Sequence, residues 1–291
     1  MSSNGSIPWL RTSGALAWIA YSNAAVPLVA AGLTVATYVM FDLPLNTWGI
    51  VLAMSGAFLI YAVERSWLAG PEDIHNRPDR VEWLHRHRVT FAVVAGVVGL
   101  VFAAAMLRVV SLKAVPVVLL LCLAAAVYCL PILPGGERLK GIWYLKPVLI
   151  AAAWTIGTVL LPVVLADQIV TSSVVMVILY RFLFLLPNTL LADVPDIDGD
   201  RLEGLSTAAM RLGPDILTMS AVIAALIPFA ALVVWMLVPV SPYILADSFA
   251  GPILAMFIWR ARPLPRIFYI LHIDLLVALP LVAATLFNLA D

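Results

Sequence analysis

Long runs of apolar residues, separated by short polar connections, constrain this chain more than any other feature of its sequence. Nine such runs cover residues 15–38, 46–63, 89–107, 114–132, 147–166, 169–191, 216–238, 242–259 and 267–289. A helix needs about 20 apolar residues to cross the hydrocarbon core of a bilayer, and most runs approach that length. The sequence has no strand-like alternation, which argues against a β-barrel. We therefore expect residues 1–291 to form a single all-α domain, a bundle of nine transmembrane helices.

Composition agrees with a chain that lies in lipid, because 63% of its residues are hydrophobic and only 12% are charged. Its formal net charge is zero, so no basic field indicates a nucleic-acid partner. The first uncharged stretch extends from Ser13 to Met40, which is too long for the apolar region of a cleaved signal peptide. It is expected to remain as the first helix.

The basic residues are distributed unevenly between alternate connections. The N-terminal tail and the connections after runs two, four, six and eight hold 14 of the 17 Lys and Arg residues. The other side holds Arg108 and Lys113, and Arg181 lies inside run six. Since connections rich in Lys and Arg stay in the cytoplasm, we expect an integral protein of the cell membrane with its N-terminus inside and its C-terminus outside.

Acidic residues gather in two of the connections that are predicted to be cytoplasmic. One cluster follows run two and the other follows run six, where four aspartates occupy residues 193–200. If this second segment is helical, Asp193, Asp196 and Asp200 share one face and Asp198 points elsewhere. Carboxylates on one stripe repel each other unless a hard divalent cation binds them, and Mg²⁺ commonly shares its coordination sphere with phosphate. The pattern favours a Mg²⁺–diphosphate site.

Two other interpretations of this segment are available. In one, it is a solvated loop in which Asp193 caps a helix whose first turn contains Pro195. In the other, "DIDGD" begins a calcium loop, but counting from Asp196 puts Arg201 at the glycine position and Thr207 at the final glutamate position. The spacing therefore excludes the calcium loop, and the solvated loop stays open.

The stretch "NTLLADVPDIDGDRLEGLSTAAMRLG", residues 188–213, resembles the second aspartate-rich motif of the UbiA superfamily of intramembrane prenyltransferases. That motif reads D-x-x-D-x-x-x-D, followed by a glycine and a threonine. The matching residues are Asp193, Asp196, Asp200, Gly204, Thr207 and Gly213. The resemblance implies a nine-helix bundle with such motifs after helices two and six. It also implies Mg²⁺-dependent transfer of a prenyl group from a prenyl diphosphate to a lipophilic or aromatic acceptor, with these aspartates as catalytic metal ligands.

The first motif departs from the family pattern. When "NRP" at residues 76–78 is aligned with the family, Glu64 takes the place of the central aspartate and Leu68 that of the last one. Ile60 and Tyr61 replace the leading pair. Glu64 is thus the remaining acidic ligand expected from this motif. Two further carboxylates, Glu72 and Asp73, lie just before "NRP". They either supply the missing metal ligands from a shifted position or form ion pairs with Arg77 and Arg80, and the sequence leaves both roles open.

A bound diphosphate also needs cations and hydrogen-bond donors. The resemblance supports a basic connection after helix four, so Lys140 and Lys146 are expected to bind the diphosphate, unless they merely set the topology. Three residues from the two motif regions are also expected to bind the diphosphate, namely Asn76, Arg77 and Arg201.

Asp247 lies in the first turns of run eight, where its carboxylate is expected to reach the membrane surface. Three other ionisable residues lie within apolar runs, where a lone charge is costly: Arg181, His272 and Asp274. Arg181 and Asp274 are expected to pair. These residues keep a second class of function open, a transporter or a non-catalytic membrane protein. Within the superfamily, the altered first motif keeps open an intramembrane terpene cyclase, in which a double bond of the substrate captures the cation.

Overall fold

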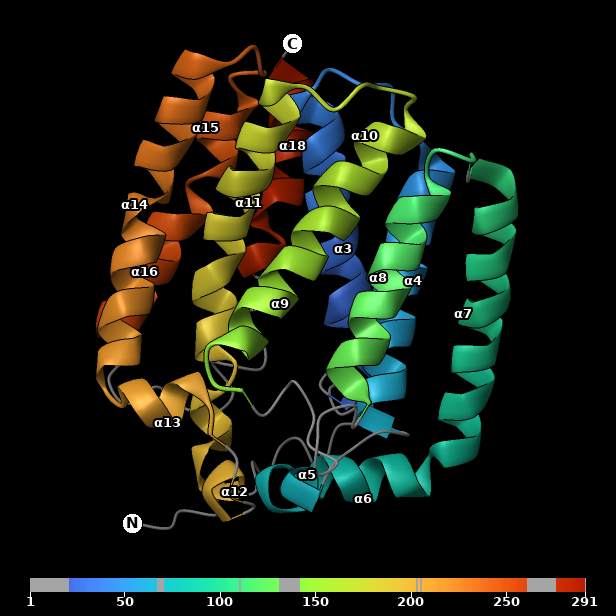
Figure 1. Ribbon diagram of the computed structural model, residues 1–291, viewed down its shortest axis with the longest axis vertical. Coiled ribbons are helices and arrows are strands. Elements are labelled where there is room, and N and C mark those ends of the chain that lie inside the picture. Colours follow the sequence, from blue (N-terminus) through green and yellow to red (C-terminus); the bar gives the residue numbers. More distant parts are fainter. Residues whose placement is uncertain are drawn as a thin grey trace.

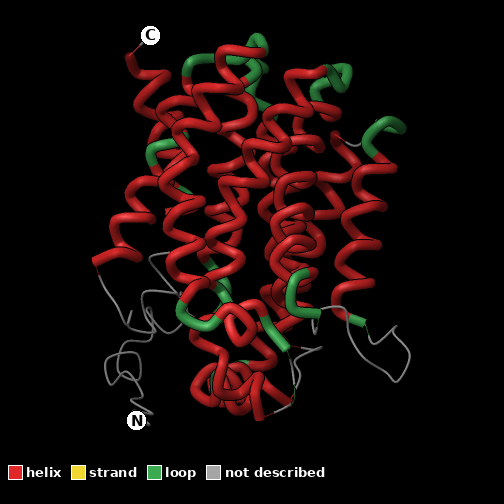
Figure 2. Tube along the Cα trace, turned by 60° about the vertical axis from the view of Figure 1, so that its left-hand side comes forward, coloured by secondary structure: helices red, strands yellow, loops and turns green. Residues whose placement is uncertain are grey.

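The computed structural model describes residues 21–66, 71–109, 111–130, 142–202, 204, 206–260 and 276–290. Within these ranges the regular structure is entirely helical (Figure 2). The helices are α3 (Ala25–Met40), α4 (Thr47–Ser66), α5 (Pro71–Asn76), α6 (Pro78–Arg86), α7 (Arg88–Val109), α8 (Val115–Cys129), α9 (Leu145–Thr155), η2 (Ile156–Leu160), α10 (Leu161–Leu165), α11 (Ser172–Leu191), η3 (Val194–Asp196), α12 (Ile197–Leu202), α13 (Ala208–Leu212), α14 (Asp215–Leu237), α15 (Tyr243–Asp247), α16 (Ala250–Arg260) and α18 (Leu279–Ala290).

Five segments of the described chain are long and apolar enough to cross a membrane. They are Thr47–Glu64, Arg88–Val109, Leu145–Leu165, Ser172–Leu202 and Asp215–Leu237. Two shorter apolar helices, Ala25–Met40 and Val115–Tyr128, overlap two further predicted runs. The run predicted at 242–259 is divided into α15 and α16, and α18 covers the end of the last run. The count of nine membrane crossings stays a prediction.

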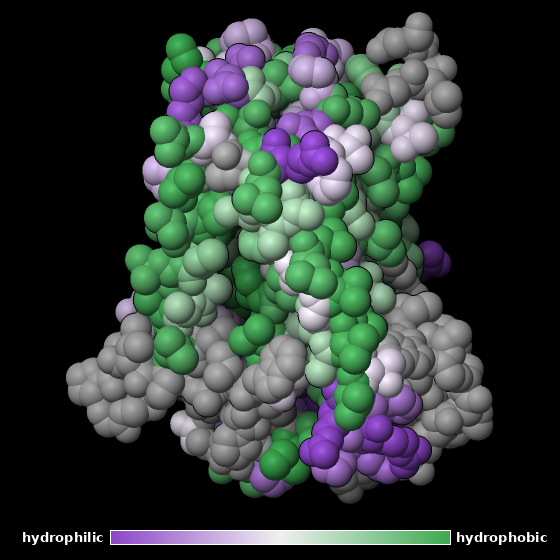
Figure 3. All heavy atoms as spheres, turned by 90° about the vertical axis from the view of Figure 1, so that its right-hand side faces the viewer, coloured by the Kyte–Doolittle hydropathy of each residue, from purple (hydrophilic) through white to green (hydrophobic). Residues whose placement is uncertain are grey.

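The outer surface of the bundle is apolar. On α7, for example, Val89 is 70% exposed, Leu100 74% and Leu107 89%. Figure 3, which shows this side of the molecule, has hydrophobic side chains over the middle of the bundle and hydrophilic ones toward its two ends. Such a continuous apolar surface marks contact with lipid. The structure is that of an integral membrane protein.

The long helices stand side by side along the long axis of the molecule, and short helices lie across one end (Figure 1). That end carries α5, α6, α12 and α13, whereas α15 and the last turns of α18 lie at the other. The main core joins α3, α11, α14 and α16 through buried side chains such as Leu33, Val177, Ala224 and Leu254. This packing fixes the long helices that surround the candidate site.

One long helix contains a π-helical segment, η2, between α9 and α10. The irregularity has a local cause in Pro162, which has no N–H to donate to the carbonyl oxygen of Thr158 four residues earlier. That carbonyl accepts a hydrogen bond from the Thr37 hydroxyl of α3 instead, at 2.6 Å. Gly157 lies in this widened turn and faces Leu121 of α8.

The arginine inside run six has a partner that the sequence did not predict. Arg181 binds both carboxylate oxygens of Asp247, at 3.0 and 3.1 Å, and both side chains are fully buried. The Tyr180 hydroxyl donates to the same carboxylate at 2.6 Å. The expectation that Asp247 reaches the membrane surface is wrong, because this residue is only 1% exposed. The partner proposed from the sequence, Asp274, lies outside the described residues, as does His272.

Candidate active site

A cavity of about 500 Å³ lies between α3, α4, α8, α9 and α11. Its lining is largely apolar, with side chains such as Leu52, Phe102, Leu121 and Leu161. Polar and charged side chains line it near α5 and α12: Glu64, Asn76, Arg77, Arg80, Lys146, Asn188, Asp193, Asp196, Asp200 and Thr207. A site with one apolar region and one charged region suits an elongated apolar ligand that has an anionic head group.

Three of the four clustered aspartates line this cavity. The chain leaves α11 at Leu191, passes through η3 and enters α12, so the segment is nearly helical throughout. Asp193 and Asp200 are 2% and 4% exposed, and Asp196 lies between them on the same face. Asp198 is exposed and is not among the residues that line the cavity. The geometric prediction from the i, i+3, i+7 spacing is thereby confirmed.

Each of these three carboxylates binds a side chain from another part of the chain. Lys146, at the start of α9, donates to Asp193 Oδ1. Arg77 Nε donates to Asp196 Oδ1 at 3.3 Å, and Asn76 Nδ2 donates to Asp200 Oδ1 at 3.0 Å. The regions after α4, before α9 and after α11 therefore meet at one end of the cavity, as the sequence predicts. The pairing matters because a buried carboxylate without a partner is costly.

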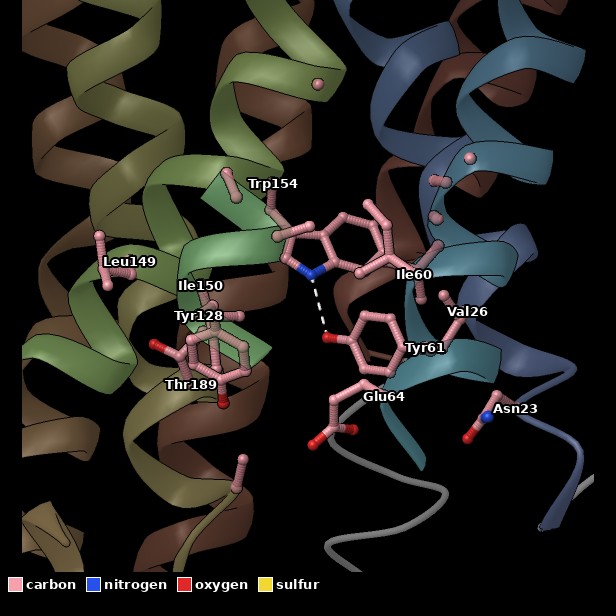
Figure 4. A pocket seen from close by; sticks show the side chains of 18 of the residues that line it. Asn23, Val26, Ile60, Tyr61, Glu64, Tyr128, Leu149, Ile150, Trp154 and Thr189 are labelled. Carbon is pink, nitrogen blue, oxygen red and sulfur yellow. Dashed lines mark hydrogen bonds between the residues drawn. The ribbon is translucent and has the colours of Figure 1, made fainter. Parts of the chain in front are cut away.

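The other residues predicted for the site differ in where the structure places them. Glu64, near the end of α4, lines the cavity and is shown in Figure 4. Arg201, by contrast, is exposed and is not among the lining residues. Lys140 lies outside the described residues. Glu72 and Asp73 belong to α5, but their side chains lie outside the described part of the structure. Whether they bind metal or pair with arginine therefore stays open.

The structure also brings to the cavity aromatic residues that sequence reasoning did not select. Trp154 Nε1 donates to the Tyr61 hydroxyl at 3.1 Å, and the two rings meet edge to face (Figure 4). Tyr128 of α8 lines the same space. A single aromatic residue in an apolar run carries no signal of function in the sequence. Tyr61 was visible only as a replacement in the altered first motif.

Two further polar residues of the lining were not selected as ligands, Asn188 and Thr207. Asn188 Nδ2 and Thr207 Oγ1 are buried and have no hydrogen-bond partner among the described residues. Asn188 lies near the end of α11, just before the acidic segment, so a polar residue in an otherwise apolar run was the available signal. Both groups can bind an anionic or polar ligand.

Two carboxylate oxygens at this end are free to bind a cation. Asp193 Oδ2 and Asp200 Oδ2 are buried and have no hydrogen-bond partner in the described part of the chain. Within that part, no three His, Cys, Asp or Glu side chains are grouped so that they could hold a metal ion by themselves. Mg²⁺ usually takes only one or two carboxylates and fills its remaining positions with water and phosphate oxygens. The residues present therefore fit Mg²⁺ in company with a diphosphate.

Solved structures share this fold. A UbiA homologue from Archaeoglobus fulgidus bound to GPP and Mg²⁺ matches with a TM-score of 0.65 and 11% identity, covering 92% of this chain and 98% of its own. A structure of a UbiA homologue from Archaeoglobus fulgidus bound to Cd²⁺ matches with a TM-score of 0.59 and 12% identity, covering 92% of this chain and 99% of its own. A structure of digeranylgeranylglyceryl phosphate synthase in membranes gives a TM-score of 0.54 and 11% identity, over 92% and 95%.

No curated protein matches this chain by sequence. The model of the UbiA prenyltransferase family, however, matches residues 25–266. That range includes the cavity-lining residues of α3, α4, α8 and α9 and the whole acidic segment after α11. With the family model spanning most of its length, the chain belongs to the UbiA prenyltransferase family.

Proposed function

We propose that this protein transfers a prenyl group from a prenyl diphosphate to a lipophilic or aromatic acceptor in a Mg²⁺-dependent reaction. One observation carries the proposal: a single cavity joins a largely apolar wall to an end where three aspartates, Lys146 and Arg77 meet. The binding of GPP and Mg²⁺ by a UbiA homologue of the same fold supports this choice of substrate and cofactor. The topology predicted from the basic residues would put this end of the cavity at the cytoplasmic side.

The charged end of the cavity would bind the diphosphate. Lys146, Arg77 and Arg80 supply positive charge around it, and Asp193 and Asp200 each direct a free oxygen that would hold Mg²⁺. Asp196, and Glu64 from α4, are further carboxylates at this end. Bound Mg²⁺ supplies charge neutralisation that makes the diphosphate a better leaving group. The fixed cations of the protein act in the same direction.

The apolar wall would hold the prenyl chain and limit access of water. When the allylic C–O bond breaks, its electron pair leaves with the diphosphate, and the remaining allylic cation reacts with the nearest nucleophile. A nucleophilic atom of the acceptor then forms the new bond and releases its proton. Because water would capture the same cation, a cavity lined by side chains such as Leu52, Leu121 and Trp154 favours transfer over hydrolysis.

Two alternatives are weighed against prenyl transfer. A terpene cyclase would use the same cavity and the same ionisation, and it would differ only in capturing the cation by a double bond of the substrate. Charged residues within the apolar runs are the feature that favours a transporter. Arg181, the described member of that group, is bound by Asp247 in the core and does not line the cavity, which weighs against transport.

The test is to incubate the detergent-purified protein with labelled geranyl, farnesyl and geranylgeranyl diphosphates and a lipid extract as the source of acceptor. Release of diphosphate and the identity of the labelled product are measured with Mg²⁺ and with EDTA. A prenylated lipid that forms only with the metal is the expected result. A cyclic hydrocarbon formed without extract would favour the cyclase. If no donor releases diphosphate, the proposed function is wrong.

A further inference from the structure

Asn76 connects the two motif regions through both ends of its side-chain amide. Its Oδ1 accepts a hydrogen bond from the backbone N–H of Gly199 at 2.9 Å, and its Nδ2 donates to Asp200 Oδ1 at 3.0 Å. The residue is only 6% exposed. It ends α5, whereas its two partners lie in α12 more than 120 positions later in the chain. The contact therefore holds the last turn of α5 against α12.

This contact requires glycine at position 199. A Cβ atom there would lie 2.1 Å from Asn76 Oδ1 and 2.5 Å from Asn76 Cγ, well inside any allowed separation. The conflict is with the amide itself, which is fixed at both ends, so any side chain at position 199 would displace it. Glycine is otherwise unfavourable inside a helix such as α12. The close approach of Asn76 explains its presence.

The three aspartates of the segment differ in the kind of partner that orients them. Lys146 and Arg77 are cations, so they neutralise Asp193 and Asp196 as well as orienting them. Asn76 is neutral, so it fixes the position of the Asp200 carboxylate and leaves its negative charge in place. The other oxygen, Asp200 Oδ2, is buried without a hydrogen-bond partner among the described residues.

We propose that Asn76, together with the glycine that lets it approach, is a positioning residue for Asp200. It orients Asp200 so that Oδ2 is directed at a hard divalent cation in the cavity. This inference rests on the proposed function, because it takes that cation to be the partner of the diphosphate. It also reassigns Asn76, which sequence reasoning selected as a diphosphate ligand. Side-chain partners that orient a metal ligand in this way typically change metal affinity by about 10–100-fold when they are removed.

The experiment measures cation binding without catalysis. The melting temperature of the detergent-purified full chain is recorded across a Mg²⁺ titration in the presence of inorganic diphosphate. The variants are Asn76→Ala, Gly199→Ala and the double variant, with Asp198→Ala as the matched control from the exposed side of α12. We expect Mg²⁺ to raise the melting temperature of the wild type and of the control with the same half-saturating concentration. Each single variant should need about 10–100-fold more Mg²⁺.

The double variant tests whether Gly199 acts through Asn76. With the amide removed, a Cβ at position 199 no longer meets it, so the double variant should need no more Mg²⁺ than Asn76→Ala alone. If Gly199→Ala fails to fold, Asn76→Ala and the double variant still decide the question.

Two results would overturn the proposal, and they can be told apart. If the variants melt at a lower temperature but keep the half-saturating Mg²⁺ concentration of the wild type, the contact only packs α5 against α12. If Mg²⁺ with diphosphate does not change the melting temperature of the wild type, the proposed function fails together with this inference.

Discussion

Asp196 and Asp198 are separated by one residue but have different surroundings. Asp196 lines the cavity and pairs with Arg77, whereas Asp198 is exposed on the other side of the segment. Replacing Asp196 with alanine removes a carboxylate that would help to organise the metal and the diphosphate. We expect Asp196→Ala to lower the rate of prenyl transfer by about 10³-fold, a loss of several kcal/mol of transition-state stabilisation. Asp198→Ala should stay within about twofold of the wild type, because surface changes are usually small.

Both variants are assayed with a labelled prenyl diphosphate across a range of Mg²⁺ concentrations, and their melting temperatures are recorded in the same detergent. The melting temperatures serve as the control for folding. Equal losses of activity in the two variants, or a loss in Asp196→Ala that follows unfolding, would show that the aspartates form a solvated or structural loop.

The buried pair of Arg181 and Asp247 permits a prediction about stability. Removing Arg181 leaves the buried Asp247 carboxylate without its counter-charge, although the Tyr180 hydroxyl still donates to it, and breaking a buried ion pair typically costs about 3–5 kcal/mol. Arg181→Leu should therefore lower the free energy of unfolding by about that amount, and Arg181→Leu/Asp247→Leu should recover part of the loss. Unfolding by denaturant in detergent measures both. If the single variant is as stable as the wild type, the pair does not support the fold.

For single residues, the sequence predicts which face of a helix a side chain occupies more reliably than it predicts which side chain binds it. Asp193, Asp196 and Asp200 follow helical spacing, so the sequence alone placed them together and Asp198 apart. The bonds of Asn76 to Gly199 and of Arg181 to Asp247 join residues 123 and 66 positions apart. Contacts of that kind depend on how whole helices pack, and no local pattern encodes them.

Among the elements, the helix formed by α9, η2 and α10 shapes the apolar part of the cavity. A Cβ at Gly157 would meet only Leu121 Cδ1, at an ordinary 3.7 Å, so Gly157→Ala should be tolerated. A phenylalanine there would occupy space that the cavity offers to a prenyl chain. We expect Gly157→Phe to lower kcat/KM for geranylgeranyl diphosphate about tenfold more than for geranyl diphosphate, because filling a pocket discriminates by chain size.

The comparison of the two donors is made for the wild type, Gly157→Ala and Gly157→Phe, with the alanine variant as the control for loss of glycine. An equal fall for both donors would indicate that this part of the cavity does not hold the end of the chain.

The helices that the sequence missed are the short ones. Apolar runs two, three, five, six and seven correspond to the five segments long enough to cross a membrane, because length and hydropathy alone identify such segments. The helices α5 and α6 lie in a polar, charged connection and have only six and nine residues, and α13 has only five. Run eight divides at Ser248 and Phe249, and Asp247, the last residue of α15, lies in the core beside Arg181.

For the whole molecule, the two ends of the bundle give a prediction of orientation. The acidic segment and α5 lie at one end, and the last turns of α18 lie at the other (Figure 1). Reporter proteins fused after Asp291 and inserted within residues 206–213 should therefore report opposite sides of the membrane, with the second in the cytoplasm. A reporter inserted between α10 and α11 is the control and should report the outer side of the membrane. Reporters at Asp291 and in 206–213 on the same side would contradict the orientation.

The pairing of Arg181 with a residue of α15 has a consequence for biogenesis. An arginine at the middle of a helix costs about 2.5–3.5 kcal/mol when that helix enters the membrane from the translocon. Asp247 is 66 residues further along, so α11 is synthesised before its counter-charge. A nascent chain that ends before Asp247 should therefore insert α11 incompletely. The arrival of α15 and its carboxylate would then hold α11 in the bilayer and, with it, the acidic segment that follows.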